Sequence, residues 1–375
     1  MKTFKEILLQ KLSSNFYNNY GVENYDEHRF GQFINEVVPI SRKIKEVAKS
    51  LIRFKTKNRI NTIASGIEQY EERLQRIYDK LNPSDKDLMI SIIAFRLLGY
   101  KKIRLPTNNN SYWNALKTVK QLKNPNDIYD PHFMHFVLEK FDLNPIGFNI
   151  KFYFSEIGVA IDFITEQYAY KLNNKNFIEA ENGDTVLDIG GCWADTALYF
   201  AHKVGQNGKV YSFEFIPDNI KLHDINTSLN PHLKDNIELI QKPISDISGL
   251  KIYYKDNGPG SSISLLPFEE QTGFSTTITI DDFVKNNNIH KIDFIKMDIE
   301  GAEPLALKGA LETIKKFRPK LAIAIYHSMD DFVNIPLWIA GLNLDYELFI
   351  GHYTLHSEET ICFAKQKLAY IDTDN

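Results

Sequence analysis

The sequence is poor in cysteine and has no long apolar run. These two absences exclude a disulfide-rich secreted protein and a membrane-spanning protein. Its 375 residues include only two cysteines, so we exclude a disulfide framework and expect a reducing compartment. The first residues, MKTFKEILLQKL, lack the apolar core of a signal peptide. The longest apolar stretch, Leu88–Ala94, is far shorter than the about 20 residues that cross a bilayer. We therefore expect a soluble, cytoplasmic protein.

A general surplus of positive charge is also missing. The chain has 44 Lys and Arg against 48 Asp and Glu, a net charge of -4. A general nucleic-acid binder is usually strongly basic, so we expect no nucleic-acid partner. The hydrophobic share of 43% is that of an ordinary globular protein with a sizeable core.

One segment departs from this balance. Residues 41–59 are rich in Lys and Arg, and Ile44, Val47, Leu51 and Phe54 form one apolar stripe at helical spacing. A basic amphipathic helix can lie on an anionic membrane surface or attract a phosphorylated substrate. We favour the simpler interpretation, in which the stripe packs on the rest of the protein and the lysines face solvent. The sequence leaves the oligomeric state open.

The chain divides into three segments by texture. Residues 1–104 form an N-terminal helical region, in which Leu88–Leu98 is apolar all round and predicts a buried helix. Residues 105–170 form a less regular connecting segment on the substrate side, with a predicted strand at Phe148–Phe154. Residues 171–375 alternate strands and helices. The predicted strands are 185–190, 209–215, 237–244, 291–298, 319–326, 346–352 and 360–364, and the predicted helices are 194–204, 217–229, 303–316 and 330–341.

This alternation predicts an α/β fold with a doubly wound, mainly parallel sheet, preceded by the helical region. The last two strands are joined by a loop without a helix, so they are expected to pair as an antiparallel edge hairpin. In such sheets, ligands bind beyond the carboxyl ends of the strands.

The stretch DIGGCWADTALYF lies at that edge. Asp188 ends the first strand, and Gly190 and Gly191 form a tight turn that lets a ligand approach the backbone. Glu214, followed by Phe215, ends the second strand, where an acid can accept both ribose hydroxyls of an adenosine-containing ligand. The alternative is a strand-end acid that only caps its loop.

The full GxGxxG pattern is absent from this turn. A dinucleotide rests its pyrophosphate on the helix N-terminus, but Trp193 is bulky and Asp195 would repel an anion there. S-adenosylmethionine carries a sulfonium and an ammonium group and no phosphate, so it suits the turn better. These residues oppose a nicotinamide-dependent oxidoreductase, which remains an alternative.

A second group of acids follows the strand at 291–298. The stretch IKMDIEGAEP supplies Asp298, Glu300 and Glu303, and His327 ends the next strand. Asp298 is a catalytic candidate because it lies at the ligand edge, whereas Glu303 also suits the first turn of a helix. His327 is a candidate general base or an ordinary loop histidine. These groups can also hold a hard ion such as Mg²⁺, but no tight ligand spacing demands it, so we assign no metal ligand.

Three stretches together resemble the FkbM family of S-adenosylmethionine-dependent methyltransferases. They are DTVLDIGGCWADTALYFA with GKVYSFEFIPDNI, IDFIKMDIEGAEPLALKGA with RPKLAIAIYH, and GHYTLHSEETICFA. The resemblance covers about residues 165–365. It implies a Rossmann-like class I methyltransferase fold with the cofactor on Asp188, Gly190, Gly191 and Glu214, and it adds weight to Asp298 and Glu300 as catalytic residues.

The resemblance also implies an O-methyltransferase that acts on a hydroxyl of a cell-surface saccharide or a related glycosylated or lipid intermediate. We expect His352 and Tyr353, which flank the edge hairpin, to bind that substrate. The family usually has glycine where this chain has Ala194, and we expect the extra methyl to be tolerated if residue 194 is helical and not in a positive-φ turn. A protein that keeps the fold without catalysis is the alternative from another class.

Overall fold

The structure, a computed structural model, describes residues 2–34, 53–133, 136–173 and 175–367, and the chain divides into two compact units. Unit 1 comprises Met1–Asn110 and His352–Thr360, and unit 2 comprises Ser111–Gly351 and Ile361–Asn375. The predicted segment 105–170 belongs mostly to unit 2. The loop at 352–360 is therefore grouped with the N-terminal helices and not with the strands that it joins.

Unit 1 is helical, as the apolar periodicity predicts. The Asn82 side chain accepts a hydrogen bond from the Asp85 backbone N–H and caps α6, and Met89–Phe95 of that helix are buried. Residues 35–52, which include Ile44, Val47 and Leu51 of the basic stripe, lie outside the described residues, so the membrane-surface hypothesis stays a prediction. The elements are α1 (Phe4–Asn15), η1 (Gly21–Asn24), α2 (Glu27–Phe30), α4 (Arg53–Ala64), η2 (Ser65–Tyr70), α5 (Glu71–Lys80) and α6 (Pro83–Leu98).

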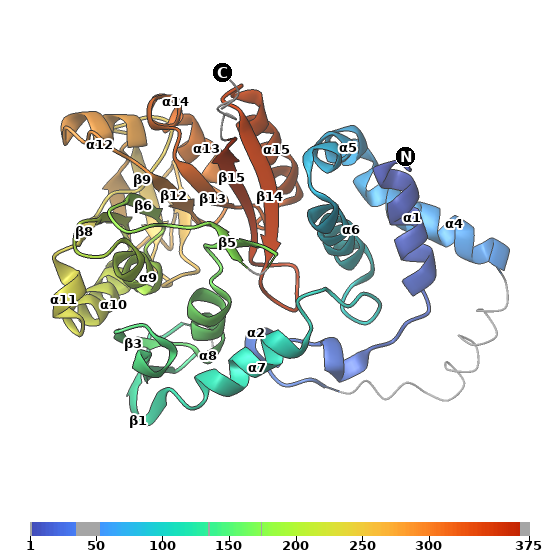
Figure 1. Cartoon of the computed structure of the whole chain (residues 1–375), viewed down its shortest axis with the longest axis horizontal. Coiled ribbons are helices and arrows are strands. Elements are labelled where there is room, and N and C mark those ends of the chain that lie inside the picture. Colours follow the sequence, from blue (N-terminus) through green and yellow to red (C-terminus); the bar gives the residue numbers. More distant parts are fainter. Residues whose placement is uncertain (1, 35–52, 134–135, 174, 368–375) are drawn as a thin grey trace, which may run out of the picture. The chain divides into compact units, whose positions relative to one another are not determined.

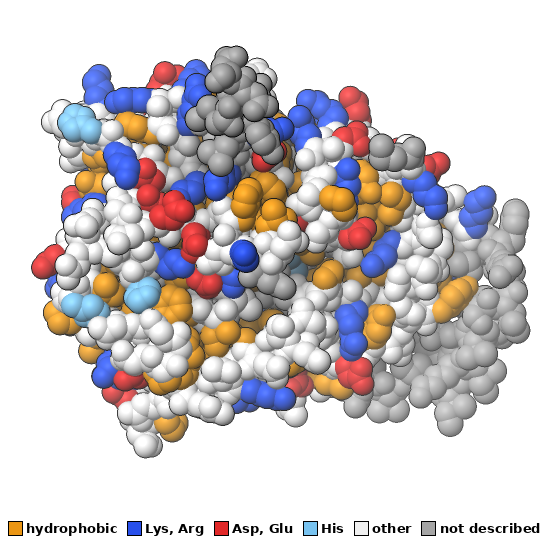
Figure 2. Space-filling model, in the orientation of Figure 1, with side chains coloured by type: hydrophobic (Ala, Val, Ile, Leu, Met, Phe, Trp, Pro, Cys, Tyr) orange, Lys and Arg blue, Asp and Glu red, His pale blue; other side chains and the backbone are white. Residues whose placement is uncertain are grey.

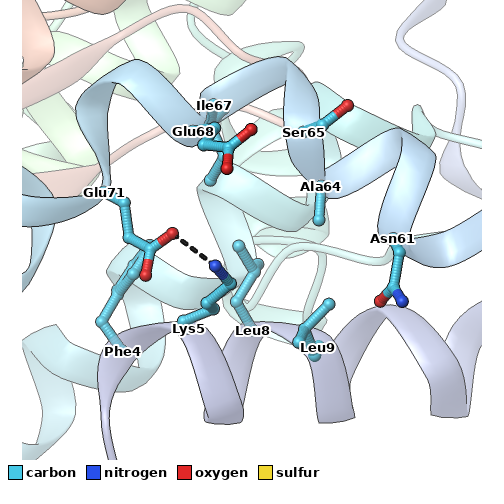
Figure 3. Close-up of a pocket in the computed structure, with 10 residues that line it drawn as sticks. All are labelled: Phe4, Lys5, Leu8, Leu9, Asn61, Ala64, Ser65, Ile67, Glu68 and Glu71. Carbon is cyan, nitrogen blue, oxygen red and sulfur yellow. Dashed lines mark hydrogen bonds and ion pairs between the residues drawn. The ribbon is translucent and has the colours of Figure 1, made fainter.

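A cavity of about 290 Å³ lies in unit 1 between α1 and the α4–η2 segment (Figure 3). Phe4, Leu8 and Ile67 supply apolar walls, and the Lys5–Glu71 ion pair of 2.7 Å spans one side. Asn61, Ser65 and Glu68 add polar groups to the lining.

Unit 2 is built on a seven-stranded sheet in the order β14-β15-β13-β12-β6-β7-β8. The strands from β8 to β13 are parallel to their neighbours, and β15 runs antiparallel to β13. Helices α9, α10 and α11 lie on one face, and α12, α13 and α14 lie on the other (Figure 1). The predicted doubly wound sheet with an antiparallel edge is confirmed. The strands are β6 (Thr185–Ile189), β7 (Lys209–Phe213), β8 (Ile237–Ile240), β12 (Phe294–Met297), β13 (Lys320–Ala324), β14 (Tyr346–His352) and β15 (Thr360–Gln366).

The four helices predicted within residues 171–375 are present, whereas α11 and α12 were not predicted. The predicted helix 303–316 is two helices, α13 and α14. They are separated at Gly309, where a Cβ would come within 2.2 Å of the Ser245 carbonyl oxygen. The helices of unit 2 are α7 (Asn110–Val119), α8 (Glu156–Val159), α9 (Asp195–Val204), α10 (Pro217–Ser228), α11 (Pro231–Lys234), α12 (Ile280–Asn286), α13 (Glu303–Lys308), α14 (Leu311–Phe317) and α15 (Met329–Gly341), with the short turns η3 (Asn144–Ile146) and η4 (Ala160–Thr165).

Three small sheets were not predicted, and only β3 (Lys151–Phe154) among their strands falls within a predicted strand. The predicted strand Phe148–Phe154 exists only over Lys151–Phe154, and the predicted strand 237–244 ends at Ile240. The small sheets are β1-β2-β3 (Lys123–Tyr129, Leu138–Asp142, Lys151–Phe154), β4-β5 (Tyr170–Leu172, Lys175–Ile178) and β10-β9-β11 (Ser262–Ser264, Lys251–Lys255, Gly273–Thr276).

The face drawn in Figure 2 carries side chains of both charges. Figure 2 shows acidic and basic side chains interspersed over the visible face, in keeping with the small net charge. Within the described ranges, none of the helices combines the length and the apolar character needed to cross a bilayer.

Candidate active site

The turn after β6 is strained and closely packed. Gly190 has a φ of 88°, and Cys192 and Ala194 also have positive φ values, of 41° and 69°. A Cβ on Gly190 would lie 2.0 Å from the carbonyl oxygen of Asp298, at the end of the neighbouring strand. Glycine is therefore required here because the neighbouring backbone comes so close, a reason that the sequence did not reveal. Non-glycine residues in the left-handed region cluster at functional sites.

The condition placed on Ala194 is not met. Ala194 has φ 69° and ψ 13°, the left-handed conformation, immediately before α9, and its side chain is fully buried. The backbone at this position favours glycine, and an L-residue there costs about 1–2 kcal/mol. The chain therefore keeps the turn of a glycine-containing motif at some cost in stability.

The Asp188 carboxylate is held by side chains from α9, β7 and β12. It accepts hydrogen bonds from the Thr196 hydroxyl at 2.9 Å and the Ser212 hydroxyl at 3.1 Å, and it pairs with Lys296 Nζ at 3.1 Å. Lys296 Nζ also donates to the Gly190 carbonyl oxygen. Both charged side chains are buried, so the pair ties β6 to β12 and fixes the turn. A direct contact of Asp188 with the cofactor stays a prediction. The contacts of Asp188 in this structure stabilise the turn after β6.

Lys296 is a buried charged residue of this candidate site that sequence reasoning missed. Burial opposes its charge, yet Asp188, Asp298 and Asp195 together raise the pKa of Lys296 above its ordinary value. The signal was present as a lone lysine inside the apolar strand FIKM, since a charged side chain in such a place is almost always paired.

Gly191 faces the same buried network. A Cβ on Gly191 would come within 2.0 Å of Ser212 Oγ and 3.4 Å of Asp188 Oδ2. The backbone at Gly191 can therefore approach the Asp188 carboxylate closely only because it lacks a side chain. Asp195, at the start of α9, has a pKa raised to about 6 by burial and by Asp188, with Lys296 opposing. At neutral pH it is largely ionised, so the exclusion of an anionic pyrophosphate still applies.

Glu214 is buried at the end of β7. Its Oε1 accepts from the backbone N–H groups of Phe215 at 2.6 Å and Ile216 at 2.8 Å, and its Oε2 accepts from Asn219 at 3.0 Å. Burial raises its pKa to about 7. Asn219 in turn accepts from the Trp193 indole N–H at 3.1 Å. The carboxylate is thus held in a fixed orientation, and its Oε2 has capacity for one more donor.

A cavity of about 240 Å³ opens beside this group. Trp193 and Asn219 both line it, so the cavity is next to the side chains that hold Glu214. The Phe215 ring packs edge-on against Tyr254 at 5.6 Å. The remaining lining residues are Ile128, Tyr129, Asp130, Pro131, His132, Asp218, Lys221 and Gly258.

Asp298 is the centre of a second polar group, directly beyond β12. Its carboxylate accepts from the Tyr168 hydroxyl at 3.0 Å and from the Tyr326 hydroxyl at 3.0 and 3.1 Å. Neither tyrosine was predicted. Tyr326 could have been found because it precedes His327 at a strand end, but Tyr168 is 130 residues distant in sequence.

His327 lies among three carboxylates. Its Nε2 is 3.4 Å from Asp298 Oδ1 and 3.6 Å from Glu300 Oε2, and its Nδ1 is 3.4 Å from Glu303 Oε1. Burial would lower its pKa, but Glu303, Asp298 and Glu300 outweigh burial and raise the pKa to about 9. An imidazole with that pKa is charged at neutral pH and has no free lone pair for a proton. The role of general base therefore stays a prediction, one that this environment opposes.

Glu300 and Glu303 differ sharply in exposure. The Glu300 side chain is 62% exposed, and its backbone has a φ of 56°. Glu303 is fully buried, and its Oε1 accepts from the Ile299 backbone N–H at 2.7 Å. Glu303 thus satisfies a backbone group at the start of α13, as the helix-capping alternative predicts, and it also faces His327.

The comparisons with known proteins concern the family and the fold of the chain. The family model described as "Methyltransferase FkbM domain" matches residues 176–348. This part of the chain is an FkbM methyltransferase domain. The predicted family, and with it an S-adenosylmethionine-dependent methyltransferase domain, is confirmed.

Several solved structures are similar to this chain. The FkbM methyltransferase of Methylobacillus flagellatus KT is 15% identical with a TM-score of 0.51, and the match covers 80% of this chain and 60% of that chain. The chain thus spans 60% of the length of that relative. Aeropyrum pernix fibrillarin with natively bound S-adenosyl-L-methionine is 13% identical with a TM-score of 0.32, covering 60% and 93%. The O-methyltransferase of Thermotoga maritima is 12% identical with a TM-score of 0.31, covering 51% and 62%. The sequence has no significant match among curated proteins.

The structure brings most predicted site residues of the FkbM domain together. Gly190 contacts Asp298, and Asp298 contacts His327, so the cofactor turn and the catalytic candidates adjoin. The predicted substrate residues His352 and Tyr353 belong instead to unit 1. His352 is buried, its Nδ1 is 2.8 Å from Thr360 Oγ1, and burial lowers its pKa to about 3. Substrate binding by His352 and Tyr353 stays a prediction.

Proposed function

We propose that the chain is an S-adenosylmethionine-dependent O-methyltransferase whose acceptor is a hydroxyl of a saccharide or of a related glycosylated or lipid intermediate. The observation that carries the reaction type is the contact between Gly190 and Asp298, because it joins the turn of the cofactor site to a cluster of proton-binding groups. The acceptor class rests on the family resemblance alone.

The cofactor, when bound, supplies an electrophilic methyl carbon on a sulfonium. Glu214 would accept hydrogen bonds from the ribose, and the Asp188–Lys296 pair would keep the turn in shape. Transfer of that methyl group to a hydroxyl would require the acceptor to be held in line with the methyl carbon and to lose its proton. Asp298 is the proposed proton acceptor, with Tyr168 and Tyr326 orienting its carboxylate.

Calorimetric titration of the purified chain with S-adenosylhomocysteine and with NAD tests the cofactor half of this proposal. We expect S-adenosylhomocysteine to bind and NAD not to bind. Glu214→Ala should weaken S-adenosylhomocysteine by about 1.5–3 kcal/mol, the range for hydrogen bonds to a charged group. The matched control is Glu238→Ala on neighbouring β8, where the carboxylate pairs with Lys209 instead.

Transfer of a labelled methyl group to a panel of sugars, glycosides and glycolipids tests the reaction half. Binding of NAD in preference to S-adenosylhomocysteine would favour the oxidoreductase alternative. Binding of S-adenosylhomocysteine without transfer to any member of the panel would favour the non-catalytic alternative.

A further inference from the structure

The cluster beyond β12 contains a set of potential metal ligands. Asp298, Glu303 and His327 each offer one ligand atom, and these atoms lie within 4.8 Å of one another. Ligands on opposite sides of a Mg²⁺ or Ca²⁺ ion are about 4–5 Å apart, given metal–oxygen distances of about 2.0–2.6 Å. The three side chains are therefore spaced to surround an ion with little movement.

Buried polar atoms of this cluster lack hydrogen-bond partners. Within the described part of the chain, Glu303 Oε2 and both ring nitrogens of His327 have none. Glu303 is fully buried, and the His327 side chain is 9% exposed. A buried polar atom without a partner costs about 1–3 kcal/mol, so three such atoms at one point indicate a missing ligand.

Carboxylates outnumber histidines at this point. Asp298, Glu300 and Glu303 supply three carboxylates around one histidine. Lys296 forms its ion pair with Asp188 and donates to the Gly190 carbonyl oxygen. A divalent cation among the carboxylates would offset most of their charge.

We propose that Asp298, Glu303 and His327 bind one divalent cation of the Mn²⁺ and Mg²⁺ class. Two carboxylate oxygens favour a hard ion, and Mn²⁺ accepts both oxygen ligands and an imidazole nitrogen. The cation displaces the proton of His327, because a ligating imidazole must be neutral. Glu300 lies 3.6 Å from His327 Nε2 on the exposed side, where it can add an oxygen or leave a position to water. The spacing in sequence did not demand a metal, whereas the fold gathers ligands from two strand ends and a helix.

If the chain transfers methyl groups as proposed above, the cation would bind the acceptor hydroxyl. The open side of the ion would take the acceptor hydroxyl, because Asp298 adjoins the cofactor turn at Gly190. A cation holding the hydroxyl oxygen lowers its pKa and orients it toward the methyl group. Cation binding itself does not depend on that reaction.

Electron paramagnetic resonance of free Mn²⁺ during titration of the full chain tests the site. We expect one Mn²⁺ per chain, displaced by excess Mg²⁺, and an affinity at least ten-fold lower in Asp298→Asn and in His327→Gln. Glu312→Gln is the matched control, since this exposed carboxylate pairs with Lys315 on α14, and it should bind Mn²⁺ like the unaltered chain. Glu303→Gln is the further variant if one of the first two does not fold, as judged by thermal unfolding.

Absence of Mn²⁺ binding at millimolar concentration in the unaltered chain, or equal binding by all variants, would overturn the cation site. S-adenosylhomocysteine binding and methyl transfer are measured on the same samples. Methyl transfer without Mn²⁺ binding would reject the cation site and support the proposed function. Mn²⁺ binding without methyl transfer would support the cation site and contradict the proposed function.

Discussion

The ligand edge of unit 2 and the β14–β15 loop both carry histidines and acids at strand ends, and the fold uses them in opposite ways. At the ligand edge, defined by the carboxyl ends of β6, β7, β12 and β13, carboxylates raise the pKa of His327 to about 9. In the loop His352–Thr360, burial lowers the pKa of His352 to about 3, and His356 and Arg96 add to that effect. The same residue type is thus charged in one place and neutral in the other at pH 7.

The difference follows from what surrounds each imidazole. His327 faces three carboxylates and has no hydrogen-bond partner within the described residues. The charges of these neighbours therefore determine its protonation state. His352 Nδ1 is 2.8 Å from Thr360 Oγ1, and the His352 backbone carbonyl accepts from the Thr107 hydroxyl. His352 therefore contributes to the packing of unit 1. A histidine at a strand end is therefore weak evidence for chemistry until its neighbours are known.

The largest effect is expected for Asp298→Asn. It should lower kcat by about 10²–10⁴, the usual contribution of a positioned acid or base, and should leave S-adenosylhomocysteine affinity nearly unchanged. Single-turnover methyl transfer and calorimetry measure the two quantities. The matched control is Asp330→Asn, because Asp330 is exposed. Asp281→Asn is unsuitable as a control because Asp281 accepts hydrogen bonds from backbone N–H groups of α14. Nearly full turnover in Asp298→Asn would move the chemistry away from this cluster.

A smaller effect, on stability, is expected for Gly190→Ala. Positive φ costs about 1–2 kcal/mol, and the 2.0 Å approach to the Asp298 carbonyl adds about 1–3 kcal/mol of overpacking. Gly249→Ala is the matched control, with a φ of 82° and nothing within 4 Å of the added Cβ. Urea denaturation should show the larger loss for Gly190→Ala. Equal losses would mean that the close contact between the turn and β12 has no energetic weight.

His352→Leu tests the other half of the comparison. It should lower the free energy of unfolding by about 1–3 kcal/mol, because the Thr360 hydroxyl loses its partner. The exposed His290 gives the control variant His290→Leu. An unchanged stability with a raised KM for the acceptor would instead place His352 in the substrate site.

The same variant predicts a pH effect with a definite sign. The folded pKa of His352, about 3, is below its ordinary value of 6.5, so stability is lost as the pH falls from 6.5 toward 3. Between pH 7.5 and 5.5 this amounts to about 1 kcal/mol. His352→Leu should show correspondingly less loss over that interval than the unaltered chain. Equal pH dependence of both would show that His352 accepts a proton in the folded state.

The smallest effect is expected for Ala194→Gly. Relief of the left-handed strain, about 1–2 kcal/mol, is offset by loss of a buried methyl, about 0.8 kcal/mol, and by a more flexible unfolded chain. The net change should be within about 1 kcal/mol, with S-adenosylhomocysteine affinity kept. Ala201→Gly, equally buried but inside α9, is the control, and it should cost about 1.5–2 kcal/mol. A similar cost at both positions would remove the strain assigned to Ala194.

Local pattern was enough for the seven strands of the main sheet, because short apolar runs between turn residues mark buried parallel strands regardless of what packs on them. It failed for the sheets β1-β2-β3 and β10-β9-β11. Of these strands, β1, β10 and β11 have no buried side chain, so their sequences lack a clear period. It also missed the short helix α12 and did not separate α13 from α14, because these helices are shorter than the window over which helical periodicity becomes clear.

The sequence by itself determined the class of fold, the family and the edge of the sheet at which the site is predicted, because strand ends and motif residues are local properties. Only the tertiary structure decided which side chains meet at that edge. Lys296 reaches Asp188 from a neighbouring strand and forms a buried ion pair with it, and Tyr168 reaches Asp298 across 130 residues. Charge states and ligand sets depend on distances between segments far apart in the chain, and those distances exist only once the chain is folded.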